Sequence, residues 1–400
     1  MFTFVAEFQL FSYSVIQQSM SIHNRRRFIK SVAASVGISA TGNIPVTAFS
    51  PFSLPMLEKR QTPRIRFSVI GLNHAHIYGQ VQTVIRGGGE LVAFYAKEPD
   101  LVAAFLKRYP DAKQAGSERE ILEDDNIQLV LSASIPSDRA PLGIRVMEHG
   151  KDFMVDKPGI ISLSQLAEVR KVQKKTKRIY SILYSERLEN KATIKAGELA
   201  RAGAIGDVIQ TIGTGPHRIS INSRPEWFFD KKYFGGILCD IGSHQFDQFL
   251  FFTGSDSGKI LASQTGNVHY PQYREFEDFG DALVQGNRGT GYIRVDWFTP
   301  DGLKTWGDAR LTVLGTEGYM EIRKNIDIAG RDGGNHLFLV NHQETKYIDC
   351  SDVDLPYGRQ LVDDIVNRTA TAMTQEHCFL ATELTLLAQK NATKIVNMMK

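Results

Sequence analysis

The chain has 400 residues, of which 42% are hydrophobic and 23% are charged, the composition of an ordinary globular protein long enough for two domains. Its formal net charge is +3, and this excess lies in residues 1–48, so the near-neutral remainder argues against a nucleic-acid partner. The three cysteines, Cys239, Cys350 and Cys378, are few and widely spaced, so we expect neither a zinc ribbon nor a disulfide framework and predict no metal site.

Near the amino end, an arginine-rich stretch precedes a short apolar run over residues 31–40. The order Arg-Arg-x-Phe-x-Lys resembles the bacterial twin-arginine export signal. The apolar run is too short and too polar to span a bilayer, and small residues provide a possible cleavage site after Ala48. The motif consists of Arg25, Arg26, Phe28 and Lys30.

This pattern predicts a signal segment over residues 1–48, a linker over 49–63 and a periplasmic protein that uses the twin-arginine export machinery. Met20 is a candidate for the true start, because residues 1–19 place apolar sequence ahead of the arginines. The alternative is a solvated basic tail. No other segment is apolar enough to anchor the mature protein in a membrane, and export would allow two of the cysteines to pair.

From Ile65 onward, short apolar runs alternate with amphipathic stretches, which predicts βαβ units and a parallel sheet. A capping box formed by Ser117 and Glu120 predicts one helix start, and Pro99 suits the first turn of another. A further helix is expected over 163–177. We therefore predict a doubly wound Rossmann domain over residues 64–183. Its expected strands are 65–71, 91–95, 128–134, 179–183 and one that begins at 153 and runs into Asp156-Lys157-Pro158.

The turn after the first strand is where a dinucleotide pyrophosphate would lie on backbone amides at a helix start. It reads GLNHAH, so only the first glycine of the G-x-G-x-x-G fingerprint is present. Asn73 can adopt a left-handed backbone, and His76 should hold the helix further from the sheet. The alternative is a plain α/β turn. The candidate cofactor-binding residues here are Gly71, Asn73, His74 and His76.

The carboxylate that contacts the adenosine ribose is expected at the end of the second strand, where the sequence reads Ala96-Lys97-Glu98. Without an acid at Ala96, Lys97 could pair with a 2′-phosphate, so NADP is at least as plausible as NAD. The alternatives are that Glu98 still serves the ribose or that Lys97 is only a surface charge.

Two later motifs, FMVDKPG (153–159) and GGILCDIGSHQFDQFLFFTG (235–254), carry a family resemblance. Together with the βαβ start, they resemble the glucose-fructose oxidoreductase, inositol dehydrogenase and rhizopine catabolism family (Gfo/Idh/MocA), over nearly all of the chain from Arg64. The family's Glu-Lys-Pro appears as Asp156-Lys157-Pro158. The residues matching its second motif are Gly235, Gly236, Asp240, Gly242, His244 and Asp247.

The resemblance implies a second, α+β domain over residues 184–400 with a large, mainly antiparallel open sheet. The stretches VDWFTPDG (295–302) and LTVLGTEGYMEI (311–322) look like strands of that sheet. Helices are expected at about 357–369 and 379–398. We also expect a homo-oligomer, either a dimer or a tetramer.

Three residues are predicted to be catalytic. Asp240 and His244 are four residues apart in a stretch with helical apolar spacing, so the carboxylate should orient the imidazole as a general base. Lys157 follows a strand end, where its ammonium could stabilise developing alkoxide charge. The alternative is a structural helix-face pair with a surface lysine. The resemblance implies that His244 takes a proton from a secondary alcohol of a sugar or polyol while hydride passes to the nicotinamide, that Lys157 also contacts the cofactor, and that Asp240 positions the ring or the substrate.

A polar, aromatic region before the second motif could form the substrate pocket. Structural roles are equally possible for its residues. The family's Pro-Asn-x-x-His loop is altered here to Pro136-Ser137-Asp138-Arg139, so a cofactor contact at Pro136 is only a candidate. Two rival functions are a redox-neutral NAD-dependent glycosidase of the same family and a sugar-binding relative without turnover. The candidate substrate residues are Arg187, His217, Arg224 and Trp227.

Overall fold

The computed structural model of the chain describes residues 63–395. The predicted export signal and all but the last residue of the predicted linker lie outside the described residues. Among the helices within 63–395, none is both long and apolar enough to cross a membrane.

The first half of the described chain forms a six-stranded parallel sheet with the order β3-β2-β1-β4-β5-β6. The central strands are buried along almost their whole length, as expected where helices cover both faces of a sheet. This order confirms the predicted doubly wound domain. The strands are β1 (Ile65–Ile70), β2 (Gly89–Tyr95), β3 (Lys113–Gln114), β4 (Leu129–Ser132), β5 (Asp152–Asp156) and β6 (Tyr180–Leu183).

The helices of this domain start largely as the sequence indicates. Pro99 is the first residue of its helix. Ser117 Oγ accepts a hydrogen bond from the backbone of Glu120, but the Glu120 carboxylate accepts from Gly116 N–H rather than from Ser117, so the predicted capping box is only half formed. The helices are α2 (His76–Arg86), α3 (Pro99–Arg108), α4 (Glu118–Leu122), α5 (Pro136–Glu148) and α6 (Leu163–Thr176).

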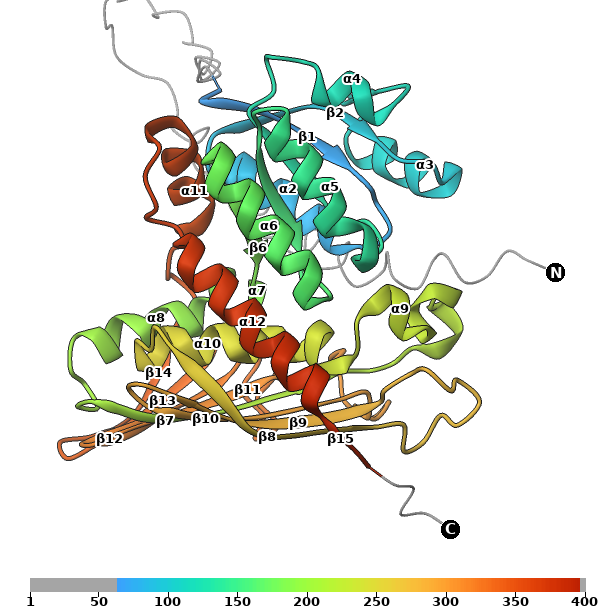
Figure 1. Cartoon of the computed structure of the whole chain (residues 1–400). Helices are drawn as coiled ribbons and strands as arrows, with labels where there is room; N and C mark the ends of the chain where they lie inside the picture. Colours follow the sequence, from blue (N-terminus) through green and yellow to red (C-terminus); the bar gives the residue numbers. More distant parts are fainter. Residues whose placement is uncertain (1–62, 396–400) are drawn as a thin grey trace, which may run out of the picture. The chain divides into compact units, whose positions relative to one another are not determined.

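The second half forms a nine-stranded, mainly antiparallel sheet with the order β14-β13-β12-β11-β7-β10-β9-β8-β15. Only the β7–β10 and β8–β15 pairs are parallel. Burial alternates along β9 and β10, because the helices of the described residues cover only one face of the sheet (Figure 1). The strands are β7 (Val208–Pro216), β8 (Gly258–Gly266), β9 (Phe279–Gly286), β10 (Thr290–Asp296), β11 (Arg310–Gly315), β12 (Gly318–Arg323), β13 (His336–Asn341), β14 (Thr345–Asp349) and β15 (Thr393–Lys394).

Of the two strand stretches expected in this sheet, one is confirmed and one needs correction. The stretch 311–322 is the predicted strand region and forms the β11–β12 hairpin, but β10 ends at Asp296, so most of 295–302 is not strand. Pro300 has no N–H to donate, and in the described structure residues 297–302 contribute one isolated bridge, between Phe298 and Arg218.

Helices α8, α10 and α12 cover one face of the second sheet in Figure 1, and α12 also contacts β6 and α6 of the first domain. The helix predicted over 379–398 is α12, which begins earlier and ends before β15. The three cysteines are buried and unpaired, so the pairing left open above does not occur. The helices are α7 (Ser185–Leu188), α8 (Lys191–Arg201), η1 (Ile221–Ser223), η2 (Glu226–Phe229), α9 (Lys231–Phe234), η3 (Leu238–Gly242), α10 (Ser243–Thr253), α11 (Tyr357–Asn367) and α12 (Gln375–Asn391).

Candidate active site

Lys157 lies directly after β5, at the carboxyl edge of the parallel sheet where such folds bind ligands. Its Nζ donates a hydrogen bond of 2.7 Å to Asp240 Oδ1, and both side chains are largely buried. Burial alone would raise the pKa of Asp240, but the Lys157 ammonium holds it below its usual value. Two of the three predicted catalytic residues thus form an ion pair that joins the two domains.

The predicted contact between Asp240 and His244 is not formed, and this is a correction. Asp240 lies on η3, a π-helical turn, whose wider spacing no longer stacks side chains four residues apart. Its carboxylate binds Lys157 instead, while Nδ1 of the buried His244 has no hydrogen-bond partner in the described structure. Burial lowers the pKa of His244 to about 4, and the charge of Glu186 only partly opposes this. His244 is therefore neutral near pH 7 and able to accept a proton.

The charged group with the largest effect on the pKa of His244 is Glu186, which is not among the residues predicted from the sequence. Its Oε2 accepts hydrogen bonds from Lys324 Nζ at 2.6 Å and from Gln245 Nε2 at 2.8 Å. Burial would raise the pKa of Glu186, but Lys324 brings it down to about 2. The only sequence signal was its position next to the substrate candidate Arg187.

That arginine, Arg187, does not line an open substrate pocket. Its guanidinium makes two hydrogen bonds to Asp247, of 2.6 and 2.7 Å, and is almost fully buried. His377 Nε2 lies 2.8 Å from the same carboxylate. A buried arginine must be paired, and this pair fixes α7 to α10. Arg187 therefore has a positioning role in this structure.

Two of the other substrate candidates lie within electrostatic reach of the ion pair. Burial lowers the pKa of His217 to about 3, with Lys157 adding to the effect and Asp240 opposing it. Burial also lowers the pKa of Arg224, again opposed by Asp240. Trp227 instead packs beside Phe228 in the aromatic core, so its contacts are structural.

Packing orients both of these polar side chains. The His217 ring lies 4.6 Å from that of Trp306, and its Nδ1 lies 3.1 Å from the carbonyl of Gly215. The Arg224 guanidinium lies over the rings of Phe228 and Trp297, at 4.4 and 5.0 Å from their centroids.

The turn after β1 fits a dinucleotide, although it keeps only one glycine of the fingerprint. Gly71 has φ of +87°, and a Cβ there would lie 2.6 Å from the Cβ of Ser134, so only glycine fits. Asn73 is not among the positive-φ residues of the described chain, which corrects our expectation; its Nδ2 instead donates to Glu98 Oε1 at 2.8 Å. Glu98 thus lies beside the turn, whereas Lys97 is exposed.

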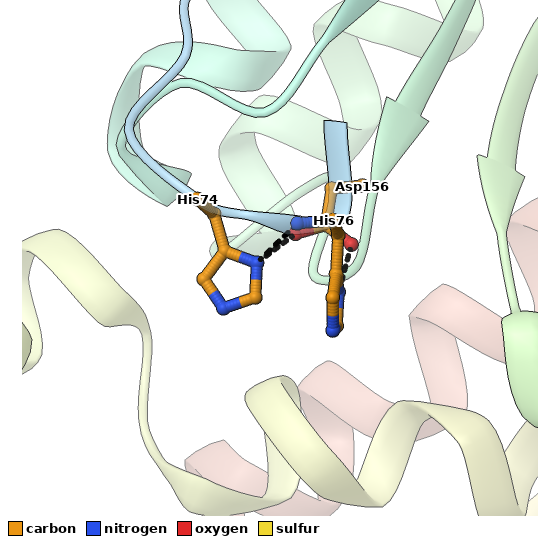
Figure 2. A group of neighbouring side chains, drawn as sticks. All are labelled: His74, His76 and Asp156. Atoms are coloured by element: carbon orange, nitrogen blue, oxygen red, sulfur yellow. Dashed lines mark hydrogen bonds and ion pairs between the residues drawn. The ribbon is translucent and has the colours of Figure 1, made fainter. Parts of the chain in front are cut away.

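Figure 2 shows that His74 and His76 both turn toward Asp156 at the end of β5. Burial lowers the pKa of His74 to about 4, and the neighbouring His76 adds to this. The His76 side chain is 45% exposed, so it does not separate helix α2 from the sheet as we predicted.

Arg139 is a second residue that sequence reasoning missed. It lies on α5, which begins at the buried Pro136, and its side chain is 1% exposed. It comes just before the position of the family loop's histidine, where this chain has Ala140. Its guanidinium donates to the carbonyls of Ser134 at 2.7 Å and Lys157 at 2.6 Å, and to Asp156 Oδ2 at 3.2 Å. Arg139 thereby fixes the backbone that carries Lys157. The altered family loop was the available signal.

Comparisons with known proteins agree with this geometry. Residues 65–184 match the model described as an oxidoreductase family with an NAD-binding Rossmann fold, and residues 193–321 match the GFO/IDH/MocA C-terminal domain. A solved structure from Erwinia carotovora atroseptica is 45% identical, with a TM-score of 0.81 over 83% of this chain and 100% of that chain.

Two curated relatives are more distant. The scyllo-inositol 2-dehydrogenase (NAD(+)) of Bacillus subtilis is 26% identical over 61% of this chain and 70% of its own length. The glycosyl hydrolase family 109 protein 1 of Bacteroides thetaiotaomicron is 24% identical over 46% of this chain, and the match spans only 42% of that protein.

Proposed function

We propose that this chain acts on a secondary alcohol of a sugar or polyol. It belongs to the GFO/IDH/MocA oxidoreductase family, and its cofactor is NAD or NADP. The observation that carries this proposal is the buried Lys157–Asp240 pair at the carboxyl edge of the nucleotide-binding sheet. The charge of Lys157 also acts on the neutral His244, whose pKa it helps to lower. The similarity to a scyllo-inositol dehydrogenase supports the substrate class.

The chemistry follows from the charges at this site. The bound nicotinamide supplies the hydride acceptor. Lys157 donates a hydrogen bond to the alcohol oxygen and stabilises the negative charge that develops there, while Asp240 holds the ammonium in place. His244 accepts the hydroxyl proton as the carbon loses its hydride, so the alcohol becomes a ketone. Gly71 and the backbone at the start of α2 would hold the pyrophosphate.

For the cofactor, the structure supports the alternative in which the Glu98 carboxylate contacts the adenosine ribose. Its carboxylate is held beside the turn by Asn73, where it would repel a 2′-phosphate. We expect Glu98→Gln to raise the ratio of NADP to NAD affinity at least about tenfold, which is about 1.4 kcal/mol. Calorimetry on cofactor-stripped protein measures the ratio. If Glu98→Gln leaves it unchanged and Lys97→Ala weakens NADP instead, the 2′-phosphate pairs with Lys97 as we first considered.

We extend the proposal to export through the twin-arginine pathway into the periplasm, supported by the motif at Arg25 and Arg26. That route, as generally understood, carries folded proteins, so the enzyme would cross the membrane with its cofactor bound. Changing both arginines to lysine should leave the precursor in the cytoplasm, as cell fractionation would show. Arg27→Lys is the matched control because it lies outside the twin pair. Export that survives the double change would contradict this part of the proposal.

A homo-oligomer, either a dimer or a tetramer, is also proposed. The uncovered face of the second sheet presents apolar residues that are 40–48% exposed, a surface that suits a second copy. Light scattering that gave a monomer mass would contradict it. These residues are Ile212, Leu261, Leu314 and Tyr319.

The similarity to glycosyl hydrolase family 109 favours one second candidate, a redox-neutral glycosidase that oxidises, eliminates and re-reduces with the same residues. Chromatography separates the two, because the glycosidase releases a free sugar from a glycoside and the dehydrogenase yields a keto sugar. A sugar-binding protein without turnover is disfavoured by the intact set of Lys157, Asp240 and His244.

A further inference from the structure

Two histidines and a carboxylate converge beside the proposed active site, although the proposed reaction assigns none of them a chemical step. His74 and His76 come from the turn between β1 and α2, while Asp156 ends β5. Strand β4 lies between β1 and β5 in the sheet, so the carboxyl ends of these strands meet at one edge. One possible ligand atom from each residue lies within 4.8 Å of the others.

The distances suit ligands of a single ion. His76 Nδ1 lies 2.9 Å from Asp156 Oδ1, and His74 Nδ1 lies 3.3 Å from Asp156 Oδ2. Two ligands bound at about 2.0–2.2 Å and at tetrahedral or octahedral angles are themselves about 3.0–3.5 Å apart. The rings lie nearly perpendicular, at 83°, with centroids 4.1 Å apart, and in Figure 2 both point away from the turn to the same side.

Hydrogen bonding within the cluster satisfies His74 poorly. Its Nδ1 lies 3.4 Å from the backbone N–H of His76, a donor, and 3.3 Å from Asp156 Oδ2, an acceptor. A protonated Nδ1 can serve only the acceptor, and an unprotonated one only the donor, so neither tautomer satisfies both contacts. A cation between the nitrogen and the carboxylate would remove the conflict with the acceptor.

The surroundings also resemble those of a ligand set. Arg139 donates to Asp156 Oδ2 and fixes the carboxylate, as outer partners of metal ligands do, while Oδ1 remains directed at His76 and Oδ2 also faces His74. Arg139 also places a positive charge beside Asp156. The charge of Lys157, the residue that follows Asp156, is balanced by its ion pair with Asp240. The side chains of His74 and His76 are 27% and 45% exposed, which gives an ion a route of entry.

We propose that His74, His76 and Asp156 bind one divalent transition-metal ion of the Zn²⁺ type. Two imidazoles and one carboxylate form a set that leaves coordination positions open for an oxygen ligand. The proposal departs from the sequence expectation of no metal site, because the two parts of the cluster are 80 residues apart in the chain.

The test is direct binding of Zn²⁺ to the full, tag-free protein after treatment with a chelator. Calorimetry should show one Zn²⁺ per chain. His74→Ala and His76→Ala should each weaken binding by about a hundredfold or more, because losing only an outer partner already costs about 10–100-fold. His149→Ala is the matched control, since it removes an exposed histidine on another element and should change nothing. Absence of saturable binding, or equal binding in all three variants, would overturn the proposal.

The wild-type protein provides a second readout that does not depend on how the variants fold. X-ray absorption of the Zn²⁺-loaded protein should show two imidazole nitrogens at about 2.0–2.1 Å. Coordination by sulfur, or by oxygen alone, would place the ion elsewhere and contradict the assignment. Neither measurement uses turnover, so a negative result leaves the proposed dehydrogenase chemistry standing.

Discussion

His244→Ala should cut turnover by about a hundredfold or more while the protein stays folded and binds its cofactor, because a general base contributes about that much. The wild-type ring is buried and its Nδ1 has no hydrogen-bond partner in the described structure. Replacing the side chain by alanine therefore breaks no hydrogen bond of that nitrogen. Steady-state kinetics with a polyol or sugar substrate measures the loss. His342→Ala, at an exposed turn, is the matched control.

The pH dependence provides a further readout for His244. The ring must be unprotonated to accept a proton, and burial lowers its pKa to about 4, so activity should fall only as the pH drops through that region. The acid limb of kcat/KM should therefore lie near 4 rather than near the ordinary histidine value of about 6.5. Wild-type turnover in His244→Ala would remove this residue from the mechanism.

Arg139→Ala should lower the free energy of unfolding by about 3–5 kcal/mol, the usual loss when one partner of a buried ion pair is removed. The change leaves the Asp156 carboxylate without its buried cation and deprives the carbonyls of Ser134 and Lys157 of a donor. Denaturation by urea measures the difference. Since the lost bonds hold the backbone of Lys157, turnover of the folded fraction should fall as well.

The control for this change is Arg145→Ala on the same helix. Arg145 pairs with Glu118 at the surface, where such pairs contribute about 0–1 kcal/mol. Comparable losses in the two variants would show that Arg139 does not organise the site.

The sequence was sufficient for the first domain, because alternating apolar runs identify parallel strands without any knowledge of contacts, whereas the second sheet was expected from the family resemblance. The sequence also selected Lys157 and His244 as candidates, since strand-end position and motif spacing are local properties. Local spacing failed at Asp240, where a π-helical turn broke the expected stacking on His244 and a lysine 83 residues away became the partner. The tertiary fold, rather than the spacing in the sequence, determines that Asp240 contacts Lys157.

The same limit explains the other differences. Sequence alone does not reveal the structural role of Arg187, because its partner, Asp247, lies 60 residues further along and belongs to a different motif. The cluster around Asp156 could have been found, since two strand ends at one sheet edge bring their flanking residues together. For Arg139 the altered family loop was the only signal, and it does not show that the side chain is buried against Asp156 and the carbonyl of Lys157.

The most direct test of the central claim follows the hydrogen itself. Protein purified without added nucleotide should contain near-stoichiometric NAD or NADP, because a cofactor with nanomolar affinity stays bound during purification. Such an affinity corresponds to a binding free energy of about 12 kcal/mol. This protein is mixed with scyllo-inositol and simple sugars that carry deuterium at their carbinol carbons, and the released cofactor is analysed by mass spectrometry. The account predicts deuterium on the reduced nicotinamide in the wild type and little in Lys157→Ala or His244→Ala. An empty protein, or a loaded one that takes deuterium from none of these alcohols, would contradict it.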